Sequence, residues 1–215
     1  MRRYLHLLLA LPLSLGALVL AGCDPTVDDD DSGSDDDDTP APDFAIWGPD
    51  FISPVPYDHP YEDECEQALP AENSCLQPNP EILWEGVPEG TESLALIFDD
   101  VSFQNYPHWA IFNIPPDAEG LEAAISGSGS GGSLPDGATE LENGFGEDGY
   151  LGSCPGGINH YRWRLWALPE VLDADLYTSL GTQAGYAELA ADADAMEIDE
   201  VRMCHVFRGS DAPNR

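Results

Sequence analysis

The sequence contains no lysine and has little positive charge of any kind. Its 215 residues include seven Lys or Arg against 41 Asp or Glu, which gives a formal net charge of −34 at pH 7. A nucleic-acid-binding protein needs clustered cations to neutralise phosphates, so this class is excluded. The same shortage disfavours adhesion to an anionic membrane through basic side chains.

Cysteine is also scarce, with five residues, and metal-binding motifs are missing. Five cysteines are too few for a miniprotein held by disulfides, and the length fits one or two ordinary domains. His59, His108, His160 and His205 show no HExxH or CxxC-type spacing. The sequence therefore predicts no metal site and no cofactor, because any metal would need ligands gathered from distant loops.

The N-terminal segment has the layout of a secretory signal. Met1-Arg2-Arg3 is followed by an apolar run over residues 5–20, and residues 20–23, Leu-Ala-Gly-Cys, resemble the bacterial lipobox. The run is shorter than the roughly 20 residues of a spanning helix and contains Pro12. We predict a lipoprotein signal peptide at 1–22 and lipidation of Cys23, which would place the protein in the bacterial cell envelope, facing the periplasm or cell surface. Plain secretion and an uncleaved anchor are the alternatives.

A run of acidic residues follows the signal. Residues 24–43 contain ten aspartates, one valine and no aromatic residue, so this segment cannot bury enough apolar surface to fold. We predict an acidic disordered tether over residues 23–43. Asp28, Asp30, Ser32 and Gly33 match the opening of an EF-hand loop, but Thr39 occupies the twelfth position, where a bidentate Glu is required.

The remaining residues, 44–215, are predicted to form one domain. Short apolar runs alternate with turn signals, which favours a mainly β fold, an antiparallel β-sandwich with a few short helices. In the third run Tyr161, Trp163 and Leu165 share one face, with Arg162 and Arg164 on the other. The predicted strands are 93–98, 109–114, 161–168 and 201–207, and the predicted helix is 182–196.

Four cysteines remain for this domain: Cys65, Cys75, Cys154 and Cys204. Cys154 lies in a G-x-C-x-G string that resembles a nucleophile elbow, but residues 155–157, Pro-Gly-Gly, do not begin a helix convincingly. In an oxidising compartment two disulfides are the better interpretation. Three pairings are possible; we favour Cys65 with Cys75 and Cys154 with Cys204.

Two stretches, 74–115 and 134–168, resemble the phosphatidylethanolamine-binding protein (PEBP) family, in particular its bacterial Raf kinase inhibitor-like branch. The resemblance depends on NPEILWEGVP, HWAIFNIP and GYLGSCP, in the family's order. It implies a PEBP-like β-sandwich with a small anion-binding pocket at one end, which agrees with the strand pattern.

The resemblance also implies the pocket residues. Asp100 matches the first acid of the family's D-P-D-x-P segment, whose other residues are replaced here. In the family's G-x-H-R-Y segment, Asn159 stands at the histidine position and His160 at the arginine position. Because neighbouring strand residues point to opposite faces, His160 is not expected to replace the missing imidazole. The ligand-binding residues implied are Asp100, His108, Gly152, Ser153, Pro155, Asn159 and Tyr161.

These observations predict a membrane-tethered, non-enzymatic binding protein whose pocket takes a small anion or a phospholipid headgroup. A histidine, a tyrosine hydroxyl and backbone N–H groups can supply the donors that an anion needs. The alternatives are a protease inhibitor or signalling regulator that contacts a protein partner, and a hydrolase that uses Cys154.

The acidic balance extends beyond the tether. Apart from the predicted signal and tether, 31 acidic residues stand against five arginines. Such a surface is typical of proteins kept soluble at high ionic strength, so we hypothesise a saline habitat. The acidic surface repels anions, so a neutral, zwitterionic or cationic ligand is an alternative to an anionic one for this pocket.

Overall fold

The structure of this protein is a computed structural model that describes residues 41–213. The predicted signal peptide, Cys23 and most of the predicted tether lie outside these residues. Within residues 41–213, no helix has both the length and the apolar character needed to cross a bilayer.

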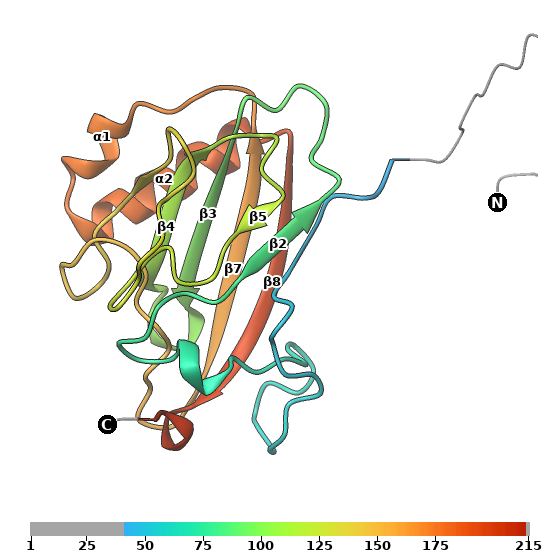
Figure 1. Ribbon diagram of the computed structural model, residues 1–215, viewed down its shortest axis with the longest axis vertical. Helices are drawn as coiled ribbons and strands as arrows, with labels where there is room; N and C mark the ends of the chain where they lie inside the picture. Colours follow the sequence, from blue (N-terminus) through green and yellow to red (C-terminus); the bar gives the residue numbers. More distant parts are fainter. Residues whose placement is uncertain (1–40, 214–215) are drawn as a thin grey trace, which may run out of the picture. The chain divides into compact units, whose positions relative to one another are not determined.

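Two antiparallel sheets form the core of the fold (Figure 1). The larger sheet has the order β6 (Thr139–Glu140), β4 (Tyr106–Ile114), β3 (Ser93–Asp100), β7 (Ile158–Leu168) and β8 (Asp199–Arg208). The smaller sheet has the order β1 (Ala45–Trp47), β2 (Ile82–Glu85) and β5 (Gly120–Leu121). The prediction of a mainly β, antiparallel fold with few helices is confirmed.

Helices contribute less of the fold. Among residues 41–213, the two α-helices are α1 (Ala174–Thr178) and α2 (Thr182–Met196), and three 3₁₀ turns lie at Ala71–Asn73, Val101–Phe103 and Gly209–Asp211. The predicted helix coincides with α2. Sequence reasoning missed α1, which is only five residues long and is capped by the Asp173 side chain.

The central strand β3 is buried along all eight residues. On one face, Leu94, Leu96 and Phe98 belong to the main core, which also contains residues of the small sheet. On the other, Ala95 and Ile97 pack in a second cluster with residues of both helices. This two-sided burial explains why the strand appears as a nearly continuous apolar run rather than an alternation.

Strand β7 shows the alternation that its sequence predicts. Tyr161, Trp163 and Leu165 are at most 1% exposed and lie in the main core. Arg162, on the opposite face, donates hydrogen bonds to the Asp99 carboxylate at 3.1 and 2.6 Å. The outer face of the strand is therefore closed by ion pairs as well as by helix α2.

The two disulfides have a different pairing from the one we favoured. Cys65 is bonded to Cys204, and Cys75 to Cys154. A short loop between Cys65 and Cys75 suggested that they would pair, but the backbone carries them to different places.

Hydrogen bonds explain the separation of Cys65 from Cys75. Just after Cys65, the chain follows β8: Val206 N–H donates to Gln67 at 2.8 Å, and Leu69 N–H donates to Val206 at 3.2 Å. Further on, Cys75 exchanges backbone hydrogen bonds with Gly152 and Ser153 at 2.9 and 3.0 Å. Each cysteine is thus brought beside a partner distant in the sequence.

Candidate functional site

A cavity of about 360 Å³ opens where β3, β4 and β7 meet the loop that follows β6. Six of the seven predicted ligand-binding residues line it, and Ser153 does not. Two larger cavities, of about 440 and 540 Å³, lie elsewhere and contain none of the predicted pocket residues. The lining consists of Asp100, Phe103, Tyr106, His108, Phe145, Leu151, Gly152, Cys154, Pro155, Gly156, Asn159 and Tyr161.

A break in strand register places His108 in the pocket. Phe98 pairs with Trp109 and Asp99 with Pro107, so His108 is an extra residue on β4 without an opposite partner on β3. Such a bulge bends the strand and re-aims a side chain. The motif that contains His108 does not indicate this bulge, because the bulge depends on how the two strands align.

Asp100 lies at the end of β3 and is 4% exposed. Asn159 Nδ2 donates a hydrogen bond to Asp100 Oδ2 at 2.7 Å. The other oxygen, Oδ1, is buried without a hydrogen-bond partner among the described residues. Burial raises the pKa of the Asp100 carboxyl. The Asn159 hydrogen bond is the strongest opposing influence, followed by the backbone N–H groups of Ser102 and Phe103 and the Tyr161 hydroxyl.

His108 is held as a neutral ring, and a backbone carbonyl determines its tautomer. Its Nδ1 lies 2.7 Å from the carbonyl oxygen of Leu151. A carbonyl can only accept, so Nδ1 carries the proton and Nε2 keeps a lone pair. Burial lowers the pKa of His108 to about 4, with the Leu151 hydrogen bond acting the other way. At neutral pH the ring therefore offers an acceptor, not a positive charge, to the cavity.

Tyr161, which lines the pocket, and Ser153, which does not, both contact the buried His205. Burial and the nearby Asp100 charge raise the pKa of Tyr161, which keeps its hydroxyl protonated. Ser153 Oγ lies 3.0 Å from His205 Nε2, and the Tyr161 ring stacks on His205 with centroids 4.9 Å apart. Ser153 is thus engaged with His205 outside the cavity lining, and its predicted part in ligand binding stays a prediction.

The pocket loop packs against the segment that carries Cys75. A Cβ added at Gly152 would lie 2.5 to 2.7 Å from backbone atoms of Asn73, Ser74 and Cys75. Gly152 is therefore required for close backbone approach. The Cys75–Cys154 disulfide fixes the same contact, and no free Cys154 thiol is available as a nucleophile in this form.

Exposed aromatic side chains beside the cavity were not anticipated. Phe103 and Phe145 line the cavity and are 60% and 63% exposed. Tyr106 also belongs to the lining and contacts the Phe103 ring at 5.8 Å between centroids. Phe103 and Phe145 lie in a turn and a loop, and Tyr106 is the first residue of β4. The one sequence signal for a role in ligand binding is the presence of aromatic residues in otherwise polar segments.

His160 points away from the pocket, as the strand alternation predicts. Its Nδ1 lies 3.4 Å from Glu64 Oε2, and its ring lies 5.2 Å from that of Tyr61. Burial lowers the pKa of His160, while the charge of Glu64 raises it. The imidazole missing at Asn159 is not replaced.

These features define a PEBP-like protein, and sequence comparison places the chain in that family. Residues 62–206 match the family described as phosphatidylethanolamine-binding protein. The chain belongs to this family.

Particular relatives come from archaea and bacteria. The UPF0098 protein of Methanothermobacter thermautotrophicus is 43% identical over 112 residues, covering 50% of this chain and 72% of that protein. YbcL of Escherichia coli is 34% identical over 134 residues, with coverages of 58% and 72%. LppC of Mycobacterium tuberculosis, whose name marks it as a candidate lipoprotein, is 35% identical over 48% of this chain and 51% of its own length.

The fold agrees with a solved structure. The crystal structure of E. coli YbcL, described as a member of the PEBP family, superposes with a TM-score of 0.61 at 22% sequence identity. The match covers 78% of this chain and 99% of the YbcL chain. At this identity the comparison establishes the shared fold.

Proposed function

We propose that this chain is a membrane-tethered, non-enzymatic binding protein of the cell envelope. Its pocket would hold the hydrogen-bond-donating head of a small amphipathic ligand, with a primary ammonium headgroup as the best match. The family membership supports a binding role, and the lipobox-like sequence ending at Cys23 supports the tether. The name of the M. tuberculosis relative is consistent with lipidation.

The main support for this proposal is that hydrogen-bond acceptors and a negative charge line the pocket. At neutral pH, Asp100 Oδ1 and His108 Nε2 both present lone pairs, and Asp100 adds negative charge. Of the described residues that line the cavity, none is Lys or Arg. A phosphate would meet these two acceptors and a negative charge, with the protonated Tyr161 hydroxyl as a donor. An ammonium group could instead donate a hydrogen bond to each acceptor.

The surroundings of the pocket support the amphipathic character of the ligand. Phe103 and Phe145 place exposed rings beside the polar base of the cavity. Aromatic faces also attract cations through their π electrons. A ligand with an ammonium head and an apolar extension would satisfy both parts.

Anion binding, expected from the family resemblance, would require protonated Asp100. Burial raises the pKa of this carboxyl, so it takes up a proton at a higher pH than a free aspartate does. A protonated carboxyl can donate a hydrogen bond to phosphate. The same pocket would then favour ammonium ligands at neutral pH and become more receptive to anions on acidification.

Isothermal titration of the full chain tests this proposal with three probes: ethanolamine, choline and inorganic phosphate. At pH 7 we expect ethanolamine to bind more tightly than choline, which has the charge but no N–H donors, and phosphate to bind weakest. Asp100→Asn should weaken ethanolamine binding about tenfold or more, because hydrogen bonds to charged groups contribute about 1.5–3 kcal/mol.

Glu147→Gln is the matched control. Glu147 is exposed on the loop that contributes Phe145, but it does not line the cavity. This variant removes one negative charge and should leave ethanolamine affinity unchanged. Phosphate binding tighter than ethanolamine binding at pH 7, or equal losses in both variants, would contradict the proposal.

A further inference from the structure

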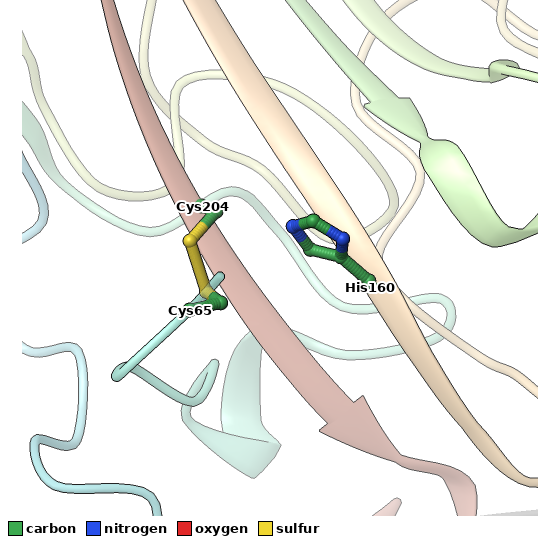
Figure 2. A group of neighbouring side chains, drawn as sticks. All are labelled: Cys65, His160 and Cys204. Atoms are coloured by element: carbon green, nitrogen blue, oxygen red, sulfur yellow. A yellow bond between two sulfur atoms is a disulfide. The ribbon is translucent and has the colours of Figure 1, made fainter. Parts of the chain in front are cut away.

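A second cluster of chemically active side chains lies on the β7–β8 face that is turned away from the pocket. Cys65, His160 and Cys204 each offer a ligand atom, and these three atoms lie within 4.8 Å of one another. Cys65 lies on the loop between β1 and the 3₁₀ turn at Ala71–Asn73, His160 on β7 and Cys204 on β8. Figure 2 shows His160 beside the Cys65–Cys204 disulfide, with the ring nitrogen farther from Cβ, Nε2, turned toward the sulfur atoms.

Glu64 fixes the other side of the imidazole. His160 Nδ1 lies 3.4 Å from Glu64 Oε2, where a proton on Nδ1 would face the carboxylate. A proton held there leaves the Nε2 lone pair on the side of the sulfurs. Histidine ligands of metal ions are commonly oriented by such a carboxylate on their second nitrogen.

We propose that, when this disulfide is reduced, Cys65, Cys204 and His160 bind a thiophilic cation of the Zn²⁺ class. Two thiolates and one imidazole are ligands that Zn²⁺ prefers, and a water molecule can complete four-coordination. The disulfide and the metal complex are alternative states of the same site. The site is separate from the pocket, because His160 and the pocket-lining Asn159 point to opposite faces of β7.

Conversion of the disulfide into the metal complex requires a reductant and then a metal ion. A dithiol reductant supplies two electrons and two protons; the Sγ–Sγ bond breaks, two thiols form, and the reductant becomes a disulfide. Zn²⁺ then displaces one proton from each thiol and forms two Zn–S bonds. His160 contributes its Nε2 lone pair without losing a proton.

Geometry and charge both favour this conversion. Tetrahedral Zn–S bonds of about 2.3 Å place two sulfurs about 3.8 Å apart, so the sulfurs must separate beyond bonding distance. The Cys65 side can provide this movement, since it lies on a loop, whereas Cys204 is held within β8. Outside the predicted signal and tether, 31 acidic residues against five arginines also raise the local concentration of cations.

Differential alkylation of the full chain tests the proposal directly. The protein is reduced with dithiothreitol, desalted without oxygen, and treated with iodoacetamide in the presence of Zn²⁺ or of a chelator. Peptide mapping should find Cys65 and Cys204 protected by Zn²⁺. Cys154, which is exposed, should be modified under both conditions and serves as the internal control. Equal modification of Cys65 and Cys204 with and without Zn²⁺ would overturn the proposal.

Cobalt binding tests the part played by His160. Reduced protein should give the visible absorption of tetrahedral Co²⁺ with a sulfur-to-cobalt band, and oxidised protein should give neither. His160→Ala should weaken Co²⁺ binding at least tenfold, while His59→Ala should leave it unchanged. Both variants keep all cysteines, and circular dichroism of the oxidised forms verifies folding. Unchanged affinity in His160→Ala, or a greater loss in His59→Ala, would overturn the assignment of the third ligand.

Discussion

Two buried histidines, His108 and His205, dominate the chemistry of the protein at the residue scale. Trp163 Nε1 donates to His205 Nδ1 at 2.9 Å, so His205 carries its proton on Nε2, 3.0 Å from Ser153 Oγ. Burial lowers the pKa of His205 well below its ordinary value and that of His108 to about 4. Both rings are therefore neutral in the folded protein at neutral pH.

The neutrality of these rings predicts loss of stability on acidification. Unfolded histidines bind a proton near pH 6.5, whereas the folded rings resist protonation; for His108 this holds down to about pH 4. Between these values the unfolded state binds more protons, so the free energy of unfolding falls as pH falls. Each such histidine contributes about 1.4 kcal/mol per pH unit. Urea unfolding at a series of pH values measures the slope.

His205→Gln isolates one histidine from other titrating groups. Burial raises the pKa values of Asp100 and Glu140, so these two carboxyls make the folded state more stable as pH falls. Their contribution is the same in the wild type and in the variant and cancels in the comparison. The variant should show a slope about 1.4 kcal/mol per pH unit smaller than the wild type in the range where His205 resists protonation. Identical slopes would show that His205 takes up a proton in the folded protein.

Residue identity in the pocket was predictable to a large extent, but residue role was not. Strand alternation correctly separated His160 from Asn159 and Tyr161. The neutral state of His108 depends on the Leu151 carbonyl and on burial, both supplied by other parts of the chain. The sequence therefore suggested a donor where the structure provides an acceptor.

At the scale of elements, the pocket loop is joined to the segment around Cys75. Gly152 and Ser153 exchange backbone hydrogen bonds with Cys75, and the Cys75–Cys154 disulfide crosses the same junction. The absence of a Cβ at Gly152 permits this contact. The loop that shapes the pocket is thus positioned by residues nearly 80 positions earlier, since the disulfide spans 79 residues.

Gly152→Ala is expected to disturb this junction. The added Cβ would clash with backbone rather than with a flexible side chain, and overpacking of this kind costs about 1–3 kcal/mol. Gly157→Ala is the matched control, because a Cβ at Gly157 meets no atom within 4 Å. Thermal denaturation should show a lower midpoint for Gly152→Ala alone; equal effects in both variants would contradict the proposed role of Gly152.

Long elements were predicted better than short ones. The strands β3, β4, β7 and β8 have clear apolar patterns of eight residues or more, whereas β5 and β6 have two residues each. Two residues are too few to show the alternation of apolar and polar side chains that predicts a strand. Such a short segment becomes a strand only through hydrogen bonds to a neighbouring strand. The disulfide connectivity failed for the same reason, because chain pairing with β8 and with the pocket loop selects each partner.

At the scale of the whole molecule, acidic charge is the dominant property. Because 31 acids and five arginines remain outside the predicted signal and tether, self-repulsion opposes folding. Salt shortens the Debye length from about 10 Å at 0.1 M to about 3 Å at 1 M and so weakens that repulsion. The repulsion between exposed acids should therefore depend strongly on salt.

We expect the domain to become more stable as NaCl rises from about 0.1 to about 1 M, the range over which this screening develops. Urea midpoints measured across this range provide the comparison. NaCl is preferred to sulfate, which stabilises folded proteins in general by exclusion from their surfaces. A midpoint that falls or stays constant would contradict both the dominant role of charge repulsion and the saline-habitat hypothesis.

The sequence by itself determined the family, the antiparallel β class, the long strands, helix α2 and most of the pocket residues, because these depend on local patterns and on motifs that keep their order. Tertiary structure decided the disulfide partners, the bulge at His108, the aromatic residues beside the cavity and the cluster of Cys65, His160 and Cys204. Each of these depends on which distant segments meet. The polarity of the pocket belongs with them, since burial and one backbone carbonyl make His108 a neutral acceptor.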